Sequence, residues 1–320
     1  MKTIKKFAHV NAATVEEAAS LLKSGKAVVL SGGTDLLSAM RFEILPNYPE
    51  VVVNLKSIPG LDYIKEESGM LKIGALARLE DISKNSTIRT KYTALAEAAH
   101  RTASPHVREM GTIGGNICQM NRCWYFRLPD NRFNCVRKGG KTCYAMAGDN
   151  RYHSIFGAVK SCLAVNPSDT APALVALNAK IKTNKGLIEA EKFWDMTVPG
   201  STILAADELV TEIQIPAPPA GAKSAFIKFA IRKSIDFPIV NCAAMIGGGD
   251  ARVCLNAVYN RPYRALKAEE VIKGKSINEA SADAAGAATV ASAKALPGDR
   301  NKWKIPIAKT MVKRAILACA

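Results

Sequence analysis

The sequence predicts an α+β protein made of three parts, which we place at residues 1–57, 58–217 and 218–320. In the first two parts short apolar strands alternate with helices, and in the third an antiparallel sheet is expected beside alanine-rich helices. A stretch rich in proline and glycine marks the second boundary. With 320 residues, 48% of them apolar, the chain is long enough to bury a core in two or three packed units.

The chain opens with a helix, a strand and a glycine turn. Thr14 and Glu17 form a capping-box pattern, and apolar residues then recur at helical spacing until Gly25 ends the helix. Residues 27–30 (AVVL) are a short apolar run that stops abruptly at 31–35 (SGGTD), after which a further helical turn is expected. This order predicts a buried strand that leads directly into a glycine turn.

The alternation continues up to the second boundary and changes beyond it. Residues 215–221 (IPAPPAG) are too rich in proline and small residues to keep a regular element. After them, two apolar runs are expected to pair as antiparallel strands, and helices are expected from Arg264 onward. The predicted strands are 51–55, 71–74, 225–230 and 240–246, and a helix is predicted at 92–103.

Two glycine turns, 31–35 and 111–116, are candidate phosphate sites. Successive glycines after a strand let consecutive backbone N–H groups point into one concavity, which binds an anion without a side-chain cation. Two such turns closing on one ligand suit a pyrophosphate, although a Gly-Gly pair alone is usually only a turn. Because no G-x-G-x-x-G follows the first strand, the usual Rossmann arrangement is excluded and a non-Rossmann fold is needed.

The net charge of +16 predicts a solvated basic surface with one local concentration. Between residues 122 and 151, seven basic side chains stand against two acidic ones. No nucleic-acid motif accompanies them, so no nucleic-acid partner is expected, and an acidic redox partner or an anionic cluster explains the charge equally well. No apolar run approaches the roughly 18 residues of a membrane span and no secretory signal is evident, so no membrane contact and a cytoplasmic location are expected.

Five of the eight cysteines fall within 45 residues, from Cys118 to Cys162. Such clustering in a chain without an export signal favours metal ligation over disulfides. Cys123, Cys135, Cys143 and Cys162 are separated by 11, 7 and 18 residues, whereas zinc ligands usually come in closer pairs, so an iron-sulfur cluster is favoured over zinc or no metal. Nearby basic residues and backbone amides would offset the negative charge of four thiolates.

Three runs of sequence together resemble the FAD subunit of the xanthine dehydrogenase and carbon monoxide dehydrogenase family, the molybdenum hydroxylases. They are 14–40 (TVEEAASLLKSGKAVVLSGGTDLLSAM), 103–117 (ASPHVREMGTIGGNI) and 166–177 (NPSDTAPALVAL), in the order and spacing of that family. Beyond the second boundary, residues 228–236 and 261–265 (RPYRA) resemble the family's C-terminal domain. The resemblance therefore covers nearly the whole chain.

The resemblance implies a two-subdomain FAD-binding domain of the PCMH (vanillyl-alcohol oxidase-like) type, followed by a C-terminal α+β domain of the CO dehydrogenase flavoprotein type. Residues 1–57 and 58–217 would sandwich FAD, and residues 218–320 would cap it. Both glycine turns would hold the FAD pyrophosphate, and the aspartate of the S-D-x-A-P motif would bond the flavin side. The residues expected to bind the cofactor are Leu30, Ser31, Gly32, Gly33, Thr34, Asp35, Leu36, His106, Met110, Gly111, Thr112, Ile113, Gly114, Gly115, Asn116, Asp169 and Lys228.

Residues 118–163, approximately, form an insertion, since 51 residues separate Asn116 from Ser168 and typical family members need fewer and have no cysteine set there. The insertion resembles that of the minority branch whose flavin subunit carries an extra [4Fe-4S] cluster, such as 4-hydroxybenzoyl-CoA reductase and three-subunit aldehyde oxidoreductase. The fourth ligand is open: Cys162 is preferred, Cys118 is a substitute, and the reductase branch has its last cysteine near the position of Tyr152. The implied metal ligands are Cys123, Cys135, Cys143 and Cys162.

The resemblance implies an electron-transfer subunit with no catalytic residue of its own, and no hydrolase motif argues otherwise. A large partner would oxidise the substrate at molybdenum, and a small partner with [2Fe-2S] clusters would pass electrons to FAD here. The [4Fe-4S] cluster would exchange electrons with ferredoxin or another carrier. Three alternatives stay open: a self-contained flavin oxidoreductase, a flavin subunit that reduces NAD, and a zinc-stapled nucleic-acid module. The substrate, whether a purine, an aldehyde or an aromatic thioester, is not readable from this chain.

Overall fold

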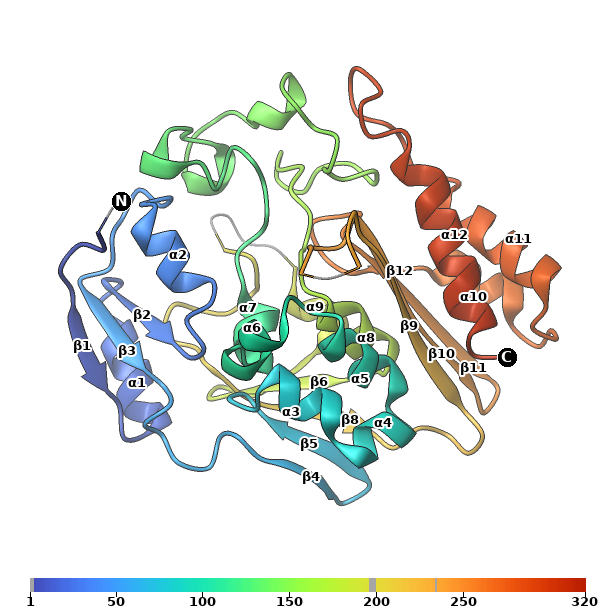
Figure 1. Cartoon of the computed structure of the whole chain (residues 1–320), viewed down its shortest axis with the longest axis horizontal. Coiled ribbons are helices and arrows are strands. Elements are labelled where there is room, and N and C mark those ends of the chain that lie inside the picture. The colour runs from blue at the N-terminus through green and yellow to red at the C-terminus, as the bar shows by residue number, and fades with distance from the viewer. Residues whose placement is uncertain (1–2, 196–199, 234) are drawn as a thin grey trace.

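The computed structural model describes residues 3–195, 200–233 and 235–320. Three separate sheets follow one another along the chain, and helices lie between and outside them (Figure 1). Separate sheets combined with helices confirm the predicted α+β class.

The first sheet is small and parallel, and it carries the first glycine turn. Its elements are β1 (Ala8–Asn11), α1 (Val15–Leu22), β2 (Ala27–Leu30), α2 (Leu36–Arg41) and β3 (Val51–Asn54). The strands lie in the order β1-β3-β2. The predicted cap of α1 is present, because the Thr14 hydroxyl accepts a hydrogen bond from the Glu17 N–H at 3.1 Å. The Glu17 carboxylate accepts from the Ala13 N–H, one residue earlier than in a full capping box.

The second sheet is antiparallel and belongs to the middle of the chain. Its strands are β4 (Ile64–Glu67), β5 (Met70–Gly74), β6 (Lys180–Thr183), β7 (Leu187–Glu189) and β8 (Val210–Pro216). They lie in the order β4-β5-β8-β6-β7, so β8 joins two hairpins that are far apart in sequence. Alternate residues of β5 and β8, such as Ile73 and Ile213, are fully buried in the largest core.

β8 extends into the stretch that we expected to have no regular structure. Ile215 and Pro216 are its last residues, and they pair with Leu71 and Met70 of β5. Proline is tolerated at such a position because the end of a strand can do without an N–H donor. The expectation that residues 215–221 are irregular throughout was therefore wrong for the first two of them.

Short helices cover this sheet and carry the second glycine turn. They are α3 (Leu79–Lys84), α4 (Ser86–Lys91), α5 (Thr93–His100), α6 (Pro105–Met110), α7 (Ile113–Cys118), α8 (Thr170–Ala176) and α9 (Ala190–Phe193). The helix predicted at 92–103 is α5, which ends three residues early because Pro105 begins a new helix with Ser104 as its cap. The indole N–H of the buried Trp194 donates to the Ile117 carbonyl at 2.9 Å and so fixes the end of α7 against the core.

The third sheet is antiparallel and covered on both faces. Its strands are β9 (Lys223–Phe229), β10 (Val240–Gly247), β11 (Asp250–Asn256) and β12 (Tyr263–Arg264), and the helices α10 (Leu266–Ile272), α11 (Glu279–Val290) and α12 (Lys304–Leu317) follow. The order is β12-β11-β10-β9. The C-terminal helices lie on one side (Figure 1), while α5 and α8 pack on the same strands from the middle of the chain. This double coverage explains why residues 240–245 are all buried.

The insertion between α7 and α8 is built mainly from turns. It includes the 3-10 turns η1 (Pro129–Asn131), η2 (Val136–Lys138) and η3 (Tyr144–Met146), and it lies between α2 and the start of α12 (Figure 1). Lys304 of α12 holds the insertion in place through hydrogen bonds. The buried Lys304 Nζ donates to the carbonyls of Tyr152 and His153, both at 3.1 Å, and to the Ala257 carbonyl at 2.6 Å.

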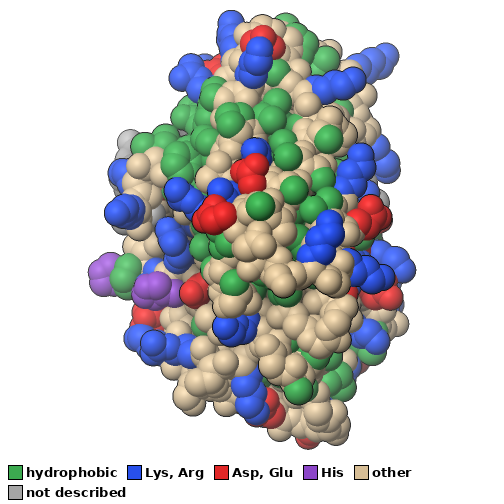
Figure 2. All heavy atoms as spheres, turned by 90° about the vertical axis from the view of Figure 1, so that its right-hand side faces the viewer, with side chains coloured by type: hydrophobic (Ala, Val, Ile, Leu, Met, Phe, Trp, Pro, Cys, Tyr) green, Lys and Arg blue, Asp and Glu red, His purple; other side chains and the backbone are tan. Residues whose placement is uncertain are grey.

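The surface over the C-terminal helices is basic but not striped. Figure 2 shows lysine and arginine side chains spread over the whole of this face, with fewer acidic ones between them. Such a distribution is typical of a solvated surface rather than of a track for a polyanion. In the described ranges, every helix is too short or too polar to cross a bilayer.

Candidate functional site

A cleft of about 550 Å³ opens between the first glycine turn, the helices α6 and α7, and the loop after β9. This volume lies within the range of about 300–1,000 Å³ that is usual for small-molecule and cofactor sites. All three predicted parts of the chain contribute to its walls. The lining includes residues 31–36, most of the second glycine turn, Asp169, and residues 235–237.

The two glycine turns touch each other across this cleft, although about eighty residues separate them along the chain. The Thr112 hydroxyl donates to the Ser31 hydroxyl at 3.1 Å. A Cβ on Gly32 would stand 2.1 Å from the Met110 carbonyl oxygen, and a Cβ on Gly115 would stand 2.9 Å from Ser31 Oγ. Glycine at these two positions is therefore what lets the turns approach.

The two turns differ in the hydrogen bonds that their amides already make. In the second turn, the Ile113 and Gly114 N–H groups donate to the Ala77 and Ala75 carbonyls, both at 2.9 Å. The N–H groups of the next two residues, 115 and 116, donate to Thr112, at 3.1 and 2.8 Å. The second turn is thus not an open nest, contrary to our expectation, because its amides cap and anchor α7.

The first turn keeps its amides free. Among the described residues, no hydrogen-bond acceptor is found for the N–H groups of residues 32–34, and Gly33 has a left-handed φ of 72°. Unpartnered successive N–H groups around a left-handed residue form an anion-binding concavity. Among the described residues, the first turn therefore offers free successive N–H groups for an anion, whereas most N–H groups of the second turn are already used.

Asp169 forms the centre of a buried polar group at the far side of the cleft. Its carboxylate accepts from Lys228 Nζ at 2.7 Å and from the Asn241 amide at 2.8 Å. Burial raises the pKa of Asp169, and the Lys228 ammonium and the Asn241 amide oppose that rise. Lys228 also donates to the Arg101 carbonyl, so it holds Asp169 in place and does not itself line the cleft.

The structure does not bring every predicted residue to the cleft. His106 and Met110 point to solvent on α6, and the side chains of Leu30 and Ile113 pack away from it. Conversely, the sequence interpretation missed many of the lining residues, among them Arg122, Ile235 and Phe237. Ile235 and Phe237 are half exposed. Two apolar residues beside charged ones in a loop could have indicated that this loop contacts a ligand.

The four predicted metal ligands line one small cavity beyond the cleft. Cys123, Cys135, Cys143 and Cys162 meet there, together with aromatic side chains of the insertion. Cys118 lies elsewhere and lines the cleft instead. Within the described part of the chain, no group of three or more His, Cys, Asp or Glu side chains is arranged so that it could hold a metal ion.

The surroundings of this cysteine cavity are rich in donors. Backbone N–H groups of Tyr125 and Phe126 reach the Cys123 thiol, and His153 Nε2 lies 3.3 Å from the same sulfur. Burial raises the pKa of Cys123 to about 12. Lys138 Nζ is buried beside the ring of Phe126, 5.5 Å from its centroid, without a hydrogen-bond partner among the described residues.

These features fit a negatively charged group bound by thiolates. A buried ammonium without a partner is costly unless an anion lies close to it. Thiolates that carry a metal centre supply that charge, and backbone N–H groups directed at sulfur stabilise it. Four thiolates around a cluster each bind a different iron and stand further apart than around a single ion, so the absence of a compact one-ion site in the described chain does not conflict with a cluster.

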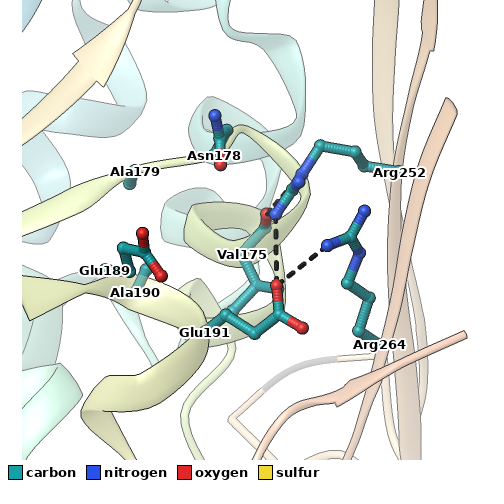
Figure 3. Close-up of a pocket in the computed structure, with 8 residues that line it drawn as sticks. All are labelled: Val175, Asn178, Ala179, Glu189, Ala190, Glu191, Arg252 and Arg264. Carbon is teal, nitrogen blue, oxygen red and sulfur yellow. Dashed lines mark hydrogen bonds and ion pairs between the residues drawn. The ribbon is translucent and has the colours of Figure 1, made fainter. Parts of the chain in front are cut away.

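A second, polar pocket of about 210 Å³ lies between α9 and the third sheet (Figure 3). Arg264 Nη1 donates to the Glu191 carboxylate at 3.0 Å, and Arg252 Nη2 donates to the Val175 carbonyl at 3.1 Å. Figure 3 shows both guanidinium groups reaching from the sheet toward α9. Because both are already engaged within the protein, this pocket joins two parts of the chain rather than offering a free charge to a ligand.

Comparison with known proteins agrees with the geometry. Residues 5–218 match the family described as the FAD binding domain in molybdopterin dehydrogenase, and residues 225–319 match the CO dehydrogenase flavoprotein C-terminal domain. The aldehyde oxidoreductase FAD-binding subunit PaoB of Escherichia coli (strain K12) is 33% identical over 82% of this chain and 84% of its own length. The nicotinate dehydrogenase FAD-subunit of Eubacterium barkeri is 29% identical over 85% of this chain and 81% of its own.

Solved structures agree as well. A chain of the carbon monoxide dehydrogenase from Hydrogenophaga pseudoflava superposes with a TM-score of 0.76 at 26% identity, covering 99% of this chain and 98% of that one. The similarity therefore extends over both predicted FAD-binding subdomains and the C-terminal part.

Proposed function

The chain belongs to the family of FAD-binding subunits of the molybdenum hydroxylases, and we propose that it also carries a [4Fe-4S] cluster beside its FAD and passes electrons between the two. Its flavin role within a heteromeric molybdenum hydroxylase follows from the family. The cluster and the external carrier are our own additions. The cluster rests on the cysteine cavity, and the external carrier is proposed only as a consequence of the cluster.

The first glycine turn is the feature that supports FAD binding most directly. The unpartnered amides of residues 32–34 face a cleft of cofactor size, and the family membership names the dinucleotide. Gly32 and Gly115 allow the second turn to lie against the first. The first turn would therefore bind the diphosphate of FAD, and the second turn would enclose it. Asp169, held by Lys228 and Asn241, offers an oriented carboxylate for the flavin side of the cofactor.

The cysteine cavity is the observation that carries the cluster. Four cysteines from a single insertion line it, backbone N–H groups point at the sulfur atoms of Cys123 and Cys143, and the buried Lys138 ammonium lacks a counter-charge without the thiolates. The Cys162 thiol lies with the other three, and Cys118 does not. We therefore assign Cys123, Cys135, Cys143 and Cys162 as the ligands.

The two sites together define a relay. When bound, FAD accepts electrons in pairs or singly, and a [4Fe-4S] cluster exchanges them one at a time. In this relay a large partner subunit would oxidise the substrate at molybdenum, and a small partner with [2Fe-2S] clusters would deliver electrons to FAD in the cleft. A cluster held by Cys123, Cys135, Cys143 and Cys162 would exchange these electrons with a carrier such as ferredoxin. Electron transfer in the opposite direction, from the carrier to FAD, would use the same two sites. The relatives are named for different substrates, such as an aldehyde and nicotinate, and these are the two substrate classes that we propose to test first on the whole complex.

A cysteine series tests this proposal. Replacing Cys123, Cys135, Cys143 or Cys162 by Ser, one at a time in the full chain prepared without oxygen, is expected to remove most of the bound iron and the electron paramagnetic resonance signal of the reduced cluster. Cys118→Ser is the matched control, because Cys118 lies in the same insertion but outside the cavity. Equal iron in all five variants and the wild type would reject the ligand assignment, whereas FAD content alone reports on the cleft.

A further inference from the structure

Asp35 lines the flavin cleft, but its carboxylate makes its hydrogen bonds and ion pairs with the insertion. It ends the first glycine turn, lines the cleft, and occupies the N-cap position of α2. An aspartate at that position usually accepts a hydrogen bond from its own helix, and this one does not. Its carboxylate is turned toward the insertion instead.

The partners of this carboxylate all come from the segment 120–127. One oxygen, Oδ1, lies 2.7 Å from Arg122 Nη2 and 2.8 Å from Arg127 Nη1. The other, Oδ2, accepts from the Met120 N–H at 3.0 Å and from Arg127 Nη2 at 3.1 Å. Burial raises the pKa of Asp35, but Arg127 and Arg122 outweigh that effect and hold the pKa below its usual value of 3.8.

The same segment contains Cys123, and Arg127 folds the backbone around it. The Arg127 guanidinium donates to the Met120 carbonyl at 2.7 Å and to the Asn121 carbonyl at 2.9 Å, while its backbone N–H donates to the Cys123 carbonyl at 3.0 Å. The Cys123 sulfur reaches the cysteine cavity from this closed turn. A single turn of chain therefore separates a carboxylate in the flavin cleft from a thiol in the cysteine cavity.

The electrostatics make the carboxylate hard to replace. Without it, the guanidinium groups of Arg122 and Arg127 would face each other at partly buried positions with no negative charge between them. Arg122 also stacks on Phe237, with 4.3 Å from its guanidinium carbon to the ring centroid, so it ties the loop after β9 to the same arrangement. Removing the carboxylate would leave the two guanidinium charges partly buried and uncompensated.

We propose that Asp35 couples the two cofactor sites, so that FAD in the cleft orders the Cys123 turn and a cluster in the cysteine cavity strengthens FAD binding. This inference rests on the proposed function, since it needs both cofactors. A ligand gripped by residues 32–34 fixes the turn from which Asp35 projects, and Asp35 in turn fixes the segment 120–127. Coupling of this kind is reciprocal and is commonly worth about 5- to 150-fold in affinity.

Hydrogen exchange on the full chain tests the coupling. In iron-free wild-type protein, saturating FAD is expected to slow amide exchange in residues 119–127 several-fold. In Asp35→Asn, which keeps the size of the side chain and one carbonyl oxygen for the Met120 N–H, FAD at a concentration that saturates the variant is expected to leave exchange in that segment unchanged. Asp149→Asn is the matched control, because Asp149 pairs with Arg151 in the same insertion but does not line the cleft. It should behave like the wild type.

Comparing FAD affinity between iron-loaded and iron-free wild-type chains gives a second measurement that needs no variant. Coupling predicts tighter binding by at least about 5-fold in the loaded form. Equal affinities, or FAD-dependent protection that persists in Asp35→Asn, would overturn the coupling and leave the proposed function standing. Failure of the wild-type chain to bind FAD at all would overturn both. If Asp35→Asn does not fold, the wild-type comparison alone decides.

Discussion

Gly32 is the residue through which the two glycine turns come into contact. Its missing side chain leaves room for the Met110 carbonyl, which a Cβ would meet at 2.1 Å. The obstacle is backbone rather than the end of a flexible side chain, so the clash cannot be relieved by a rotamer change. The turns must separate for any larger residue to fit, and the cleft between them would widen.

Gly32→Ala is therefore expected to weaken FAD binding by at least about tenfold, which corresponds to ~1.4 kcal/mol. Overpacking of this kind costs roughly 1–3 kcal/mol when the neighbours cannot move. Fluorescence titration of FAD into the apo-protein measures the affinity, and the melting temperature reports on the fold. Unchanged affinity with an unchanged melting temperature would show that the contact between the turns does not shape the site.

For single residues, the sequence predicted which glycine turns lie at the cleft, but it did not predict which of their N–H groups are free. The pattern S-G-G-T-D predicted a phosphate turn, and the structure leaves its amides free. The pattern G-T-I-G-G-N predicted a second one, but Ala75 and Ala77 use its amides. Nothing local in the sequence reveals that, because the acceptors lie about forty residues earlier in the chain.

At the level of elements, α12 supports the insertion through one buried lysine. Lys304 donates to three carbonyls, two of which belong to the insertion and one to the loop after β11. Burial lowers the pKa of Lys304 to about 7. The folded protein therefore holds this proton less tightly than the unfolded chain, in which a lysine has its usual pKa of 10.5.

This difference predicts a pH dependence of stability with a definite sign. Between about pH 7 and 10.5 the unfolded state binds more protons at Lys304, so its contribution makes the free energy of unfolding rise with pH, by at most about 1.4 kcal/mol per unit. Lys304→Met, which keeps an unbranched side chain one atom shorter and without a charge, should remove that rise. Urea unfolding at several pH values in this range measures it. The same slope in the variant and in the wild type would contradict the assignment.

The strands show where sequence patterns work and where they fail. Apolar runs at 51–55, 71–74, 225–230 and 240–246 predicted strands close to β3, β5, β9 and β10. β8 was not predicted, and its last two residues lie in the stretch whose proline content was taken to exclude regular structure. Pro216 is tolerated there because the end of a strand can do without an N–H donor. Short strands such as β6 and β7 carry too few apolar residues to be recognised without their neighbours.

At the level of the whole molecule, the parts of the chain that carry the first two sheets and the loop after β9 line one cleft, and the insertion adds a second cavity. The family resemblance predicted an FAD-binding part followed by a C-terminal domain, and the matches over residues 5–218 and 225–319 confirm the family. The sequence alone does not reveal the contacts between the parts. The Asp35 carboxylate meets Arg122 and Arg127, and Arg264 meets Glu191, over long separations that no local pattern encodes.

The domain boundaries at about 57 and 217 stay predictions, as do the cytoplasmic location and the external carrier. The sheets change near both boundaries, which favours the division. Partners are a property of the family, and the surface that receives each of them has to be found with the assembled complex.

Cofactor content is the measurement that tests the central claim most directly. The full chain, expressed with its partner subunits and purified without oxygen, is separated and analysed for FAD and iron. We predict one FAD and about four iron atoms for each copy of this chain, with the iron lost when the cysteines of the cavity are replaced. FAD without iron would contradict the cluster, and a chain with neither would contradict the account as a whole.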